Sequence, residues 1–145
     1  TLCVLEGLLG YERAKGTTSA VRDARLRGQE YLLERKLFRS LSTGKAIESD
    51  RKSGRDWRKF SFPTRWHYDV LWSLDYLRKA EVGSDERVTE AVDLVAGKQR
   101  QDGRWRLDSL HAGAVHFEME GGRGTASRWN TLRALRVLDW HSTRG

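Results

Sequence analysis

Apolar side chains recur at the spacing of an amphipathic helix in five segments of the chain. These segments are residues 2–13, 20–38, 65–80, 85–98 and 128–140. Apolar residues at i, i+3, i+4 and i+7 share one face of a helix, so each segment predicts a helix with a buried stripe. Gly28 falls on the stripe of the second segment, which indicates that a neighbouring element approaches closely there. The pattern predicts an all-α fold.

The first, third and fifth segments share the same leucine spacing. Each carries one leucine triplet: Leu2/Leu5/Leu8, Leu71/Leu74/Leu77 and Leu132/Leu135/Leu138. The second and fourth segments also align, so the repeating unit is a helix pair, present twice and followed by half of a third. Such pairs stack side by side and bury each apolar face on the next repeat. A spacing of roughly 60 residues is too long for tetratricopeptide or ankyrin units.

Two further segments do not fit the helical pattern. Residues 39–64 form a polar loop that is longer than most loops in compact domains, so we interpret it as functional or partly disordered. Residues 114–120 alternate between apolar and polar side chains, which predicts a strand. Val115, Phe117 and Met119 would point to one side of this strand and His116, Glu118 and Glu120 to the other.

The stretch from Gln99 to Trp105 lies where the fourth helical pattern ends. Asp102-Gly103 is a turn dipeptide, and glycine adopts positive φ easily just past a helix end. Gln99 lies in the last helical turn, where its amide can bond unpaired backbone groups. Trp105 then returns a large aromatic surface toward the helix. We interpret the stretch as a helix stop whose exit path is fixed by an aromatic side chain.

A helix that ends in Gln-x-x-Asp-Gly-x-Trp resembles the repeat of squalene–hopene cyclases and their relatives. Gln99, Asp102, Gly103 and Trp105 match this motif in full, and residues 65–71 and 127–135 also resemble bacterial squalene-cyclase-like proteins. The resemblance to the superfamily of terpenoid cyclases and protein prenyltransferases implies an α/α toroid, in which inner and outer helices alternate around a central cavity. It also implies that the motif is a structural tie between neighbouring outer helices.

Two and a half helix pairs are too few to close such a toroid. The sole methionine is Met119, and the chain begins directly in a helical stripe. We therefore expect residues 1–145 to form one α/α-toroid-like domain, a partial ring of about five helices, with the missing repeats elsewhere in the same parent protein.

The residues that the resemblance would require for catalysis are not found. Hopene-type cyclases protonate an alkene with an Asp-x-Asp-Asp motif, which this sequence does not contain. Protein prenyltransferases activate a thiol with zinc held by Asp, Cys and His, whereas Cys3 has no recognisable partner motif. The sequence therefore names no catalytic residue, and whether the protein is an enzyme stays open.

A candidate cavity wall lies at two predicted helix starts. Helix N-termini concentrate partial positive charge and unpaired N–H groups, and aromatic walls suit a carbocation or a hydrophobic chain. The candidates for the wall are Trp66, His67, Tyr68, Asp69, Arg128, Trp129 and Asn130. The alternative interpretation makes Trp66 and Trp129 core anchors and makes His67 and Asp69 a capping pair.

The candidate cavity predicts binding of a prenyl or other hydrophobic small molecule. The charge of the chain adds two alternatives to this function. The net charge of +7 allows a non-catalytic scaffold whose arginine-rich surface binds an acidic partner. Binding of nucleic acid through the basic segment Lys52 to Lys59 is the least favoured class. In the helices, arginine alternates with acidic residues, which is typical of a solvated face.

Composition excludes several other classes. No apolar run approaches the length of a transmembrane span. The single cysteine excludes an internal disulfide and favours a cytoplasmic location. The spacing of His111, His116, Glu118 and Glu120 matches no strong metal signature. We therefore expect neither a bound metal nor a cofactor.

Overall fold

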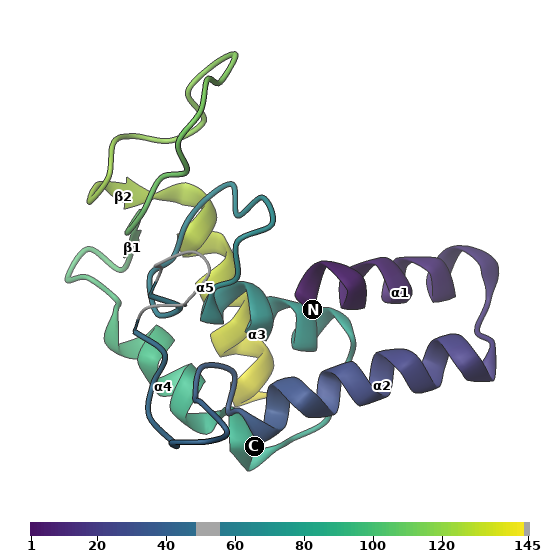
Figure 1. The fold of residues 1–145 in the computed structure, drawn as a ribbon. Coiled ribbons are helices and arrows are strands. Elements are labelled where there is room, and N and C mark those ends of the chain that lie inside the picture. The colour runs from purple at the N-terminus through teal and green to yellow at the C-terminus, as the bar shows by residue number, and fades with distance from the viewer. Residues whose placement is uncertain (49–55, 144–145) are drawn as a thin grey trace.

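Helices dominate the described part of the chain, residues 1–48 and 56–143, in the computed structural model (Figure 1). The helices are α1 (Leu2–Lys15), α2 (Ser19–Glu34), α3 (Val70–Lys79), the 3-10 turn η1 (Glu86–Val88), α4 (Thr89–Gly97) and α5 (Arg128–Ser142). Two short strands, β1 (Trp105–Arg106) and β2 (Ala126–Ser127), pair antiparallel with Trp105 opposite Ser127. The prediction of a mainly helical protein is therefore confirmed.

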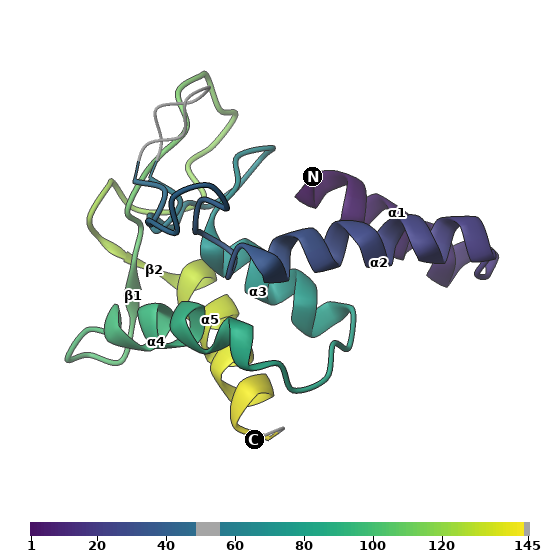
Figure 2. The same cartoon turned by 60° about the horizontal axis from the view of Figure 1, so that its bottom comes forward.

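Helix α3 occupies the centre of the arrangement. Helices α1 and α2 form an antiparallel hairpin, α3 packs between this hairpin and α5, and α4 covers α3 and α5 from another side (Figures 1 and 2). Every residue from Val70 to Leu77 is buried. Because α3 has neighbours on several sides, its leucine triplet is fully enclosed, whereas Leu132 and Leu135 of α5 stay 40% and 48% exposed.

The close approach predicted at Gly28 occurs between α1 and α2. A Cβ atom added to Gly28 would lie 2.7 Å from Cδ2 of Leu5, which is a buried residue of α1. Glycine thus lets the two helices pack against each other at this point. An ion pair between Glu12 and Arg25, 3.0 Å long and almost enclosed, joins the same two helices near the hairpin turn.

Two predicted helix boundaries are wrong, and backbone conformation explains both. The third helix begins at Val70 rather than Arg65, since Arg65 has a φ of 51° and Asp69 caps the helix with its side chain. The second helix ends at Glu34 rather than Phe38, because Lys36 and Leu37 have φ angles of 45° and 67°. Leu37 is nevertheless only 1% exposed. A buried residue in this turn therefore gives the same apolar pattern as one more turn of the helix.

The predicted strand over residues 114–120 is also wrong. These residues form no ladder, and residues 112–119 are all exposed. A strand needs a neighbouring edge for its backbone hydrogen bonds, and the available pairing is made instead by β1 and β2. The described part of the 39–64 loop is anchored by Phe60, which is fully buried, and by a bridge between Arg39 and Ala46.

Candidate functional site

The stretch from Gln99 to Trp105 ends α4 in a tight turn. Gly103 has a φ of 75°, as the turn dipeptide predicts. The Gln99 side-chain amide donates to the carbonyl of Gly103 at 3.3 Å, and the Asp102 carboxylate accepts from the backbone of Arg104 at 3.1 Å. These contacts all remain within the turn.

Trp105 connects the turn to two helices. Its side chain is fully buried, and the indole N–H donates to the carbonyl of Val95 in α4 at 2.7 Å. Its backbone N–H donates to the hydroxyl of Thr131 in α5 at 3.0 Å. The tryptophan therefore fixes α4 and α5 relative to each other, while Gln99 acts locally.

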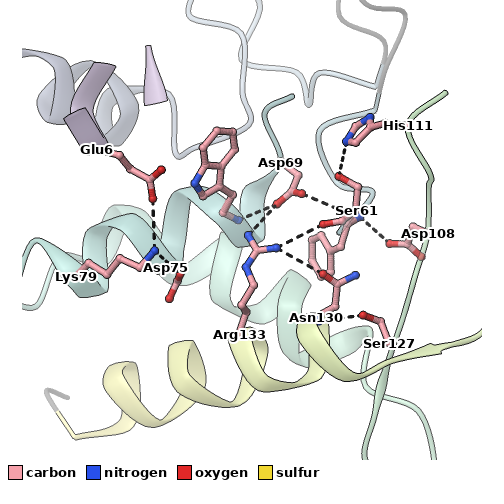
Figure 3. Close-up of polar contacts among 12 residues, drawn as sticks. Glu6, Ser61, Asp69, Asp75, Lys79, Asp108, His111, Ser127, Asn130 and Arg133 are labelled. Atoms are coloured by element: carbon pink, nitrogen blue, oxygen red, sulfur yellow. Dashed lines mark hydrogen bonds and ion pairs between the residues drawn. The ribbon is translucent and has the colours of Figure 1, made fainter. Parts of the chain in front are cut away.

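Asp69 lies in a buried polar cluster rather than on an open cavity wall (Figure 3). Its carboxylate accepts from the backbone N–H groups of Trp72 at 2.7 Å and Ser61 at 3.3 Å. Burial raises the pKa of Asp69, and the nearby Arg133 guanidinium opposes this effect. One nitrogen of Arg133 lies 3.9 Å from the carboxylate. Asp69 is therefore a helix cap and half of a loose ion pair.

Arg133 and Asn130 extend this cluster from α5. Arg133 donates to the carbonyl of Ser61 at 3.4 Å and to the side-chain oxygen of Asn130 at 3.5 Å. Asn130 is fully buried, and its amide donates to the carbonyl of Arg106 at 3.1 Å. Arg133 and Ser61 are not among the residues predicted from the sequence. The available signal was that Arg133 shares a helix face with the buried Asn130 and Val137.

A second group of polar contacts holds residues 108–111 beside residues 60–61 (Figure 3). The Asp108 carboxylate accepts from the backbone of Phe60 at 2.9 Å and from Lys98 at 2.5 Å. His111 lies 3.1 Å from the hydroxyl of Ser61, and its ring stacks on His67 with centroids 4.2 Å apart. In the described ranges, no three metal-ligating side chains come together. These contacts hold the two segments against each other.

The predicted cavity residues do not share one cavity wall. Trp66 is 70% exposed, and together with Tyr68 it lines a small cavity of about 160 Å³. The Tyr68 hydroxyl donates to the carbonyl of Leu37, and burial raises the pKa of this phenol. Trp129 instead stacks on Phe62, with ring centroids 5.1 Å apart, beside the second cavity. The prediction that Trp66 and Trp129 share one wall is therefore not supported by this arrangement.

The second cavity, called here the loop pocket, has a volume of about 460 Å³. It is lined by Phe62, Pro63, Leu110, His111 and residues 113–122. Three of its apolar side chains are largely open to solvent: Leu110, Val115 and Phe117 are 51%, 57% and 70% exposed. Residues 114–120, which the sequence predicts as a strand, thus form most of the pocket wall as a loop.

Arginine side chains anchor the loop that forms this pocket. Three guanidinium groups donate to its backbone carbonyls: Arg65 to Ala112 at 3.2 Å, Arg123 to Asp108 at 3.0 Å and Arg128 to Met119 at 2.9 Å. Glu120 accepts from the backbone of Trp129 at 3.1 Å and from the Ser127 hydroxyl at 2.9 Å. Glu120 therefore caps α5, and Arg128 anchors the loop.

The basic segment Lys52 to Lys59 can be described only in part. Residues 52–55 lie outside the described ranges. Within those ranges, Arg58 pairs with Asp56 at 2.9 Å and with Glu48 at 3.3 Å. Its positive charge is therefore already balanced by carboxylates of the same loop.

Comparison with protein-family models, with curated proteins and with solved structures gave no match to the chain. Within residues 1–48 and 56–143, each helix is too short or too polar to span a bilayer.

Proposed function

We propose that this chain is a helical-repeat protein that binds a hydrophobic small molecule, of the size and character of a prenyl chain, in the loop pocket. The observation that carries the proposal is the exposure of Leu110, Val115 and Phe117 around a cavity of about 460 Å³. Ligand pockets of roughly 300–1,000 Å³ with mainly apolar walls are typical of small-molecule sites. An apolar ligand would remove these side chains from water at a gain of about 25 cal/mol per Å².

Ring stacking and hydrogen bonds anchor the residues around the pocket. Phe62 and Trp129 stack nearly parallel, with an angle of 15° between their rings, and support one end of the pocket. The three arginine contacts hold the loop that forms the pocket through its backbone carbonyls. Because these contacts use backbone carbonyls, the apolar side chains of the wall remain available to a ligand.

Helix packing supports the relationship to terpenoid cyclases as part of the proposal. In an α/α toroid, inner helices lie beside inner helices and outer beside outer. Here α3 packs against α1 on one side and α5 on the other, and α2 contacts η1 at the start of α4. This order agrees with α1, α3 and α5 as inner helices and with α2 and α4 as outer helices of an arc.

The scaffold alternative gains less support from the described contacts. Several arginines that would attract an acidic partner already pair with carboxylates of the same molecule. Arg39 pairs with Glu90, Arg87 pairs with Glu30 and Asp85, and Arg25 pairs with Glu12. Such pairs lower the positive potential that a distant acidic surface would meet.

Thermal unfolding in the presence of farnesol and farnesyl diphosphate tests the proposal. At saturating ligand we expect the unfolding midpoint to rise by on the order of 5 °C. Phe117→Ser should abolish the rise, because this side chain is a largely exposed part of the pocket wall. Trp66→Ala is the matched control, since Trp66 lines the other cavity.

Either of two results would contradict the proposal. One is the absence of any shift with both ligands, and the other is an equal shift in the Phe117→Ser variant. A shift with the diphosphate that disappears at moderate salt, with none for farnesol, would show charge binding and also count against it.

A further inference from the structure

We propose a second binding site, separate from the loop pocket, for a small aromatic carboxylate. The site is the cavity of about 160 Å³ between the start of α1, the end of α2 and residues 57–72. We call it the aromatic cavity. Six side chains define its chemistry: Tyr31, Arg35, Trp57, Trp66, Tyr68 and Trp72. The inference does not depend on the function proposed for the loop pocket.

The walls of this cavity are mainly aromatic faces and edges. Trp57 and Tyr68 lie with ring centroids 4.6 Å apart and an angle of 56° between their planes. Trp72 is 7% exposed and lies deep, whereas Trp66 is 70% exposed and forms part of the rim. Aromatic rings favour tilted and offset contacts, so the ring of a ligand can pack against these walls. The volume suits one ring and is too small for a prenyl chain.

Arg35 supplies the one charged side chain among the described residues that line the cavity. Its guanidinium donates to the Tyr31 hydroxyl at 2.5 Å and to the carbonyl of Arg39 at 3.1 Å. Its central carbon lies 5.1 Å from the ring centroids of both Tyr31 and Trp57. In the described ranges Arg35 forms no salt bridge. Among the described residues, the cation is therefore held in place without a carboxylate partner.

This arrangement selects the charge of the ligand. A carboxylate would form charge-assisted hydrogen bonds to a guanidinium that is already oriented. A quaternary ammonium or another cation would normally use the aromatic faces, but Arg35 already lies over two of them and would repel it. A neutral ring would gain only apolar contact. We therefore infer an aromatic ring that carries a carboxylate as the occupant.

Three ligands of similar shape test the inference on the whole protein. Benzoate, benzyl alcohol and benzylammonium differ mainly in charge, and binding can be followed by calorimetry and by tryptophan fluorescence. Fluorescence reports on the site because Trp57, Trp66 and Trp72 line it. We expect benzoate to bind saturably and about tenfold more tightly than benzyl alcohol, with benzylammonium weakest. Equal affinity for all three, or no saturable binding of benzoate, would overturn the proposal.

Variants assign the effect to this cavity. Arg35→Gln should lower the affinity for benzoate to that of benzyl alcohol, and Arg35→Lys should retain part of it. Arg27→Gln, the same change at an exposed position of α2, should leave binding unchanged. Trp66→Leu should weaken binding of benzoate and benzyl alcohol alike, and its exposed position makes a folding defect unexpected.

Two measurements keep the test decisive. If Arg35→Gln does not fold, rising ionic strength in the unmodified protein should weaken binding of benzoate and leave that of benzyl alcohol unchanged. Phe117→Ser should leave benzoate binding intact. Loss of benzoate binding in Phe117→Ser would overturn the assignment to the aromatic cavity, whereas failure of the prenyl experiment alone would not affect it.

Discussion

Helix α3 and the loop of residues 110–122 both carry apolar side chains at a regular spacing, helical in α3 and alternating in the loop, but only those of α3 are buried. Every residue of α3 from Val70 to Leu77 is buried, whereas residues 112–119 are all exposed. Helix α3 has α1, α4 and α5 as neighbours, so its side chains find apolar partners in several directions. The loop is held through backbone carbonyls and through the side chains of His111 and Glu120 near its ends. Apolar residues therefore build the core in one region and a candidate ligand surface in the other.

Replacing tryptophan in the packed region should produce the largest effect. Trp105→Ala should lower the free energy of unfolding by about 3–5 kcal/mol, because it leaves a cavity and removes the bond to Val95. The matching change in the loop, Phe117→Ala, should alter it by less than about 0.5 kcal/mol. Urea unfolding of both variants measures the contrast. Similar losses would show that the two regions do not differ as the packing implies.

The polar cluster around Asp69 should give the next largest effect. Asp69→Ala removes the acceptor for Trp72 and Ser61 and leaves the buried Arg133 guanidinium uncompensated. We expect a loss of about 3 kcal/mol in urea unfolding. Asp69→Asn keeps an acceptor for the helix cap, so its loss should be clearly smaller. If both variants lost the same amount, charge rather than capping would be the main contribution of Asp69.

Acidification should give the smallest effect. Two aspartates of the same region respond differently to it, because the pKa of Asp75 is lowered and that of Asp69 is raised. Burial raises the pKa of Asp75, but hydrogen bonds from Lys79 and Arg78 outweigh it, and the net pKa is lowered. This stabilisation is present above the unfolded-state value and is lost as the pH falls through the folded-state pKa. The pKa of Asp69 is raised, so this residue takes up its proton at a higher pH in the folded state than in the unfolded state. Asp69 therefore does not add to the loss of stability in acid.

Unfolding of the unmodified protein and of Asp75→Asn at about pH 7 and about pH 3 checks this prediction. The unmodified protein should lose about 1 kcal/mol more on acidification than the variant, since exposed partners such as Lys79 limit the gain. An equal acid loss in both proteins would assign the loss to other carboxylates.

Local patterns predicted the helices well and their ends less well. Periodicity located all five helices, and the turn at Gly103 followed from its dipeptide. The start of α3 was misplaced, because Trp66 lies at a helical spacing from Val70 although it precedes the cap at Asp69. The end of α2 was misplaced for a similar reason, since Leu37 is buried from a turn. An apolar residue in the pattern indicates that a position is buried, but it does not show that the position belongs to a helix.

The candidate site was harder to predict because it depends on distances between remote segments. Nothing in the local pattern indicates that Trp66 and Trp129 lie beside different cavities, or that Ser61 meets Arg133. Asp69 matches the alternative interpretation, in which it caps a helix. Arg35 carries no sequence motif at all, and its significance arises only from the rings of Tyr31 and Trp57 that α2 and the following loop bring around it.

The three arginine anchors of the loop pocket share one electrostatic property. Arg65, Arg123 and Arg128 hold the loop by donating to carbonyl oxygens. Arginine stays protonated in proteins, and a backbone carbonyl has no proton to gain or lose in this range. Acid that releases carboxylate-based contacts elsewhere leaves these three in place. If the pocket binds a ligand as proposed, these three anchors of its wall therefore hold with the same charge state from neutral to acidic solution.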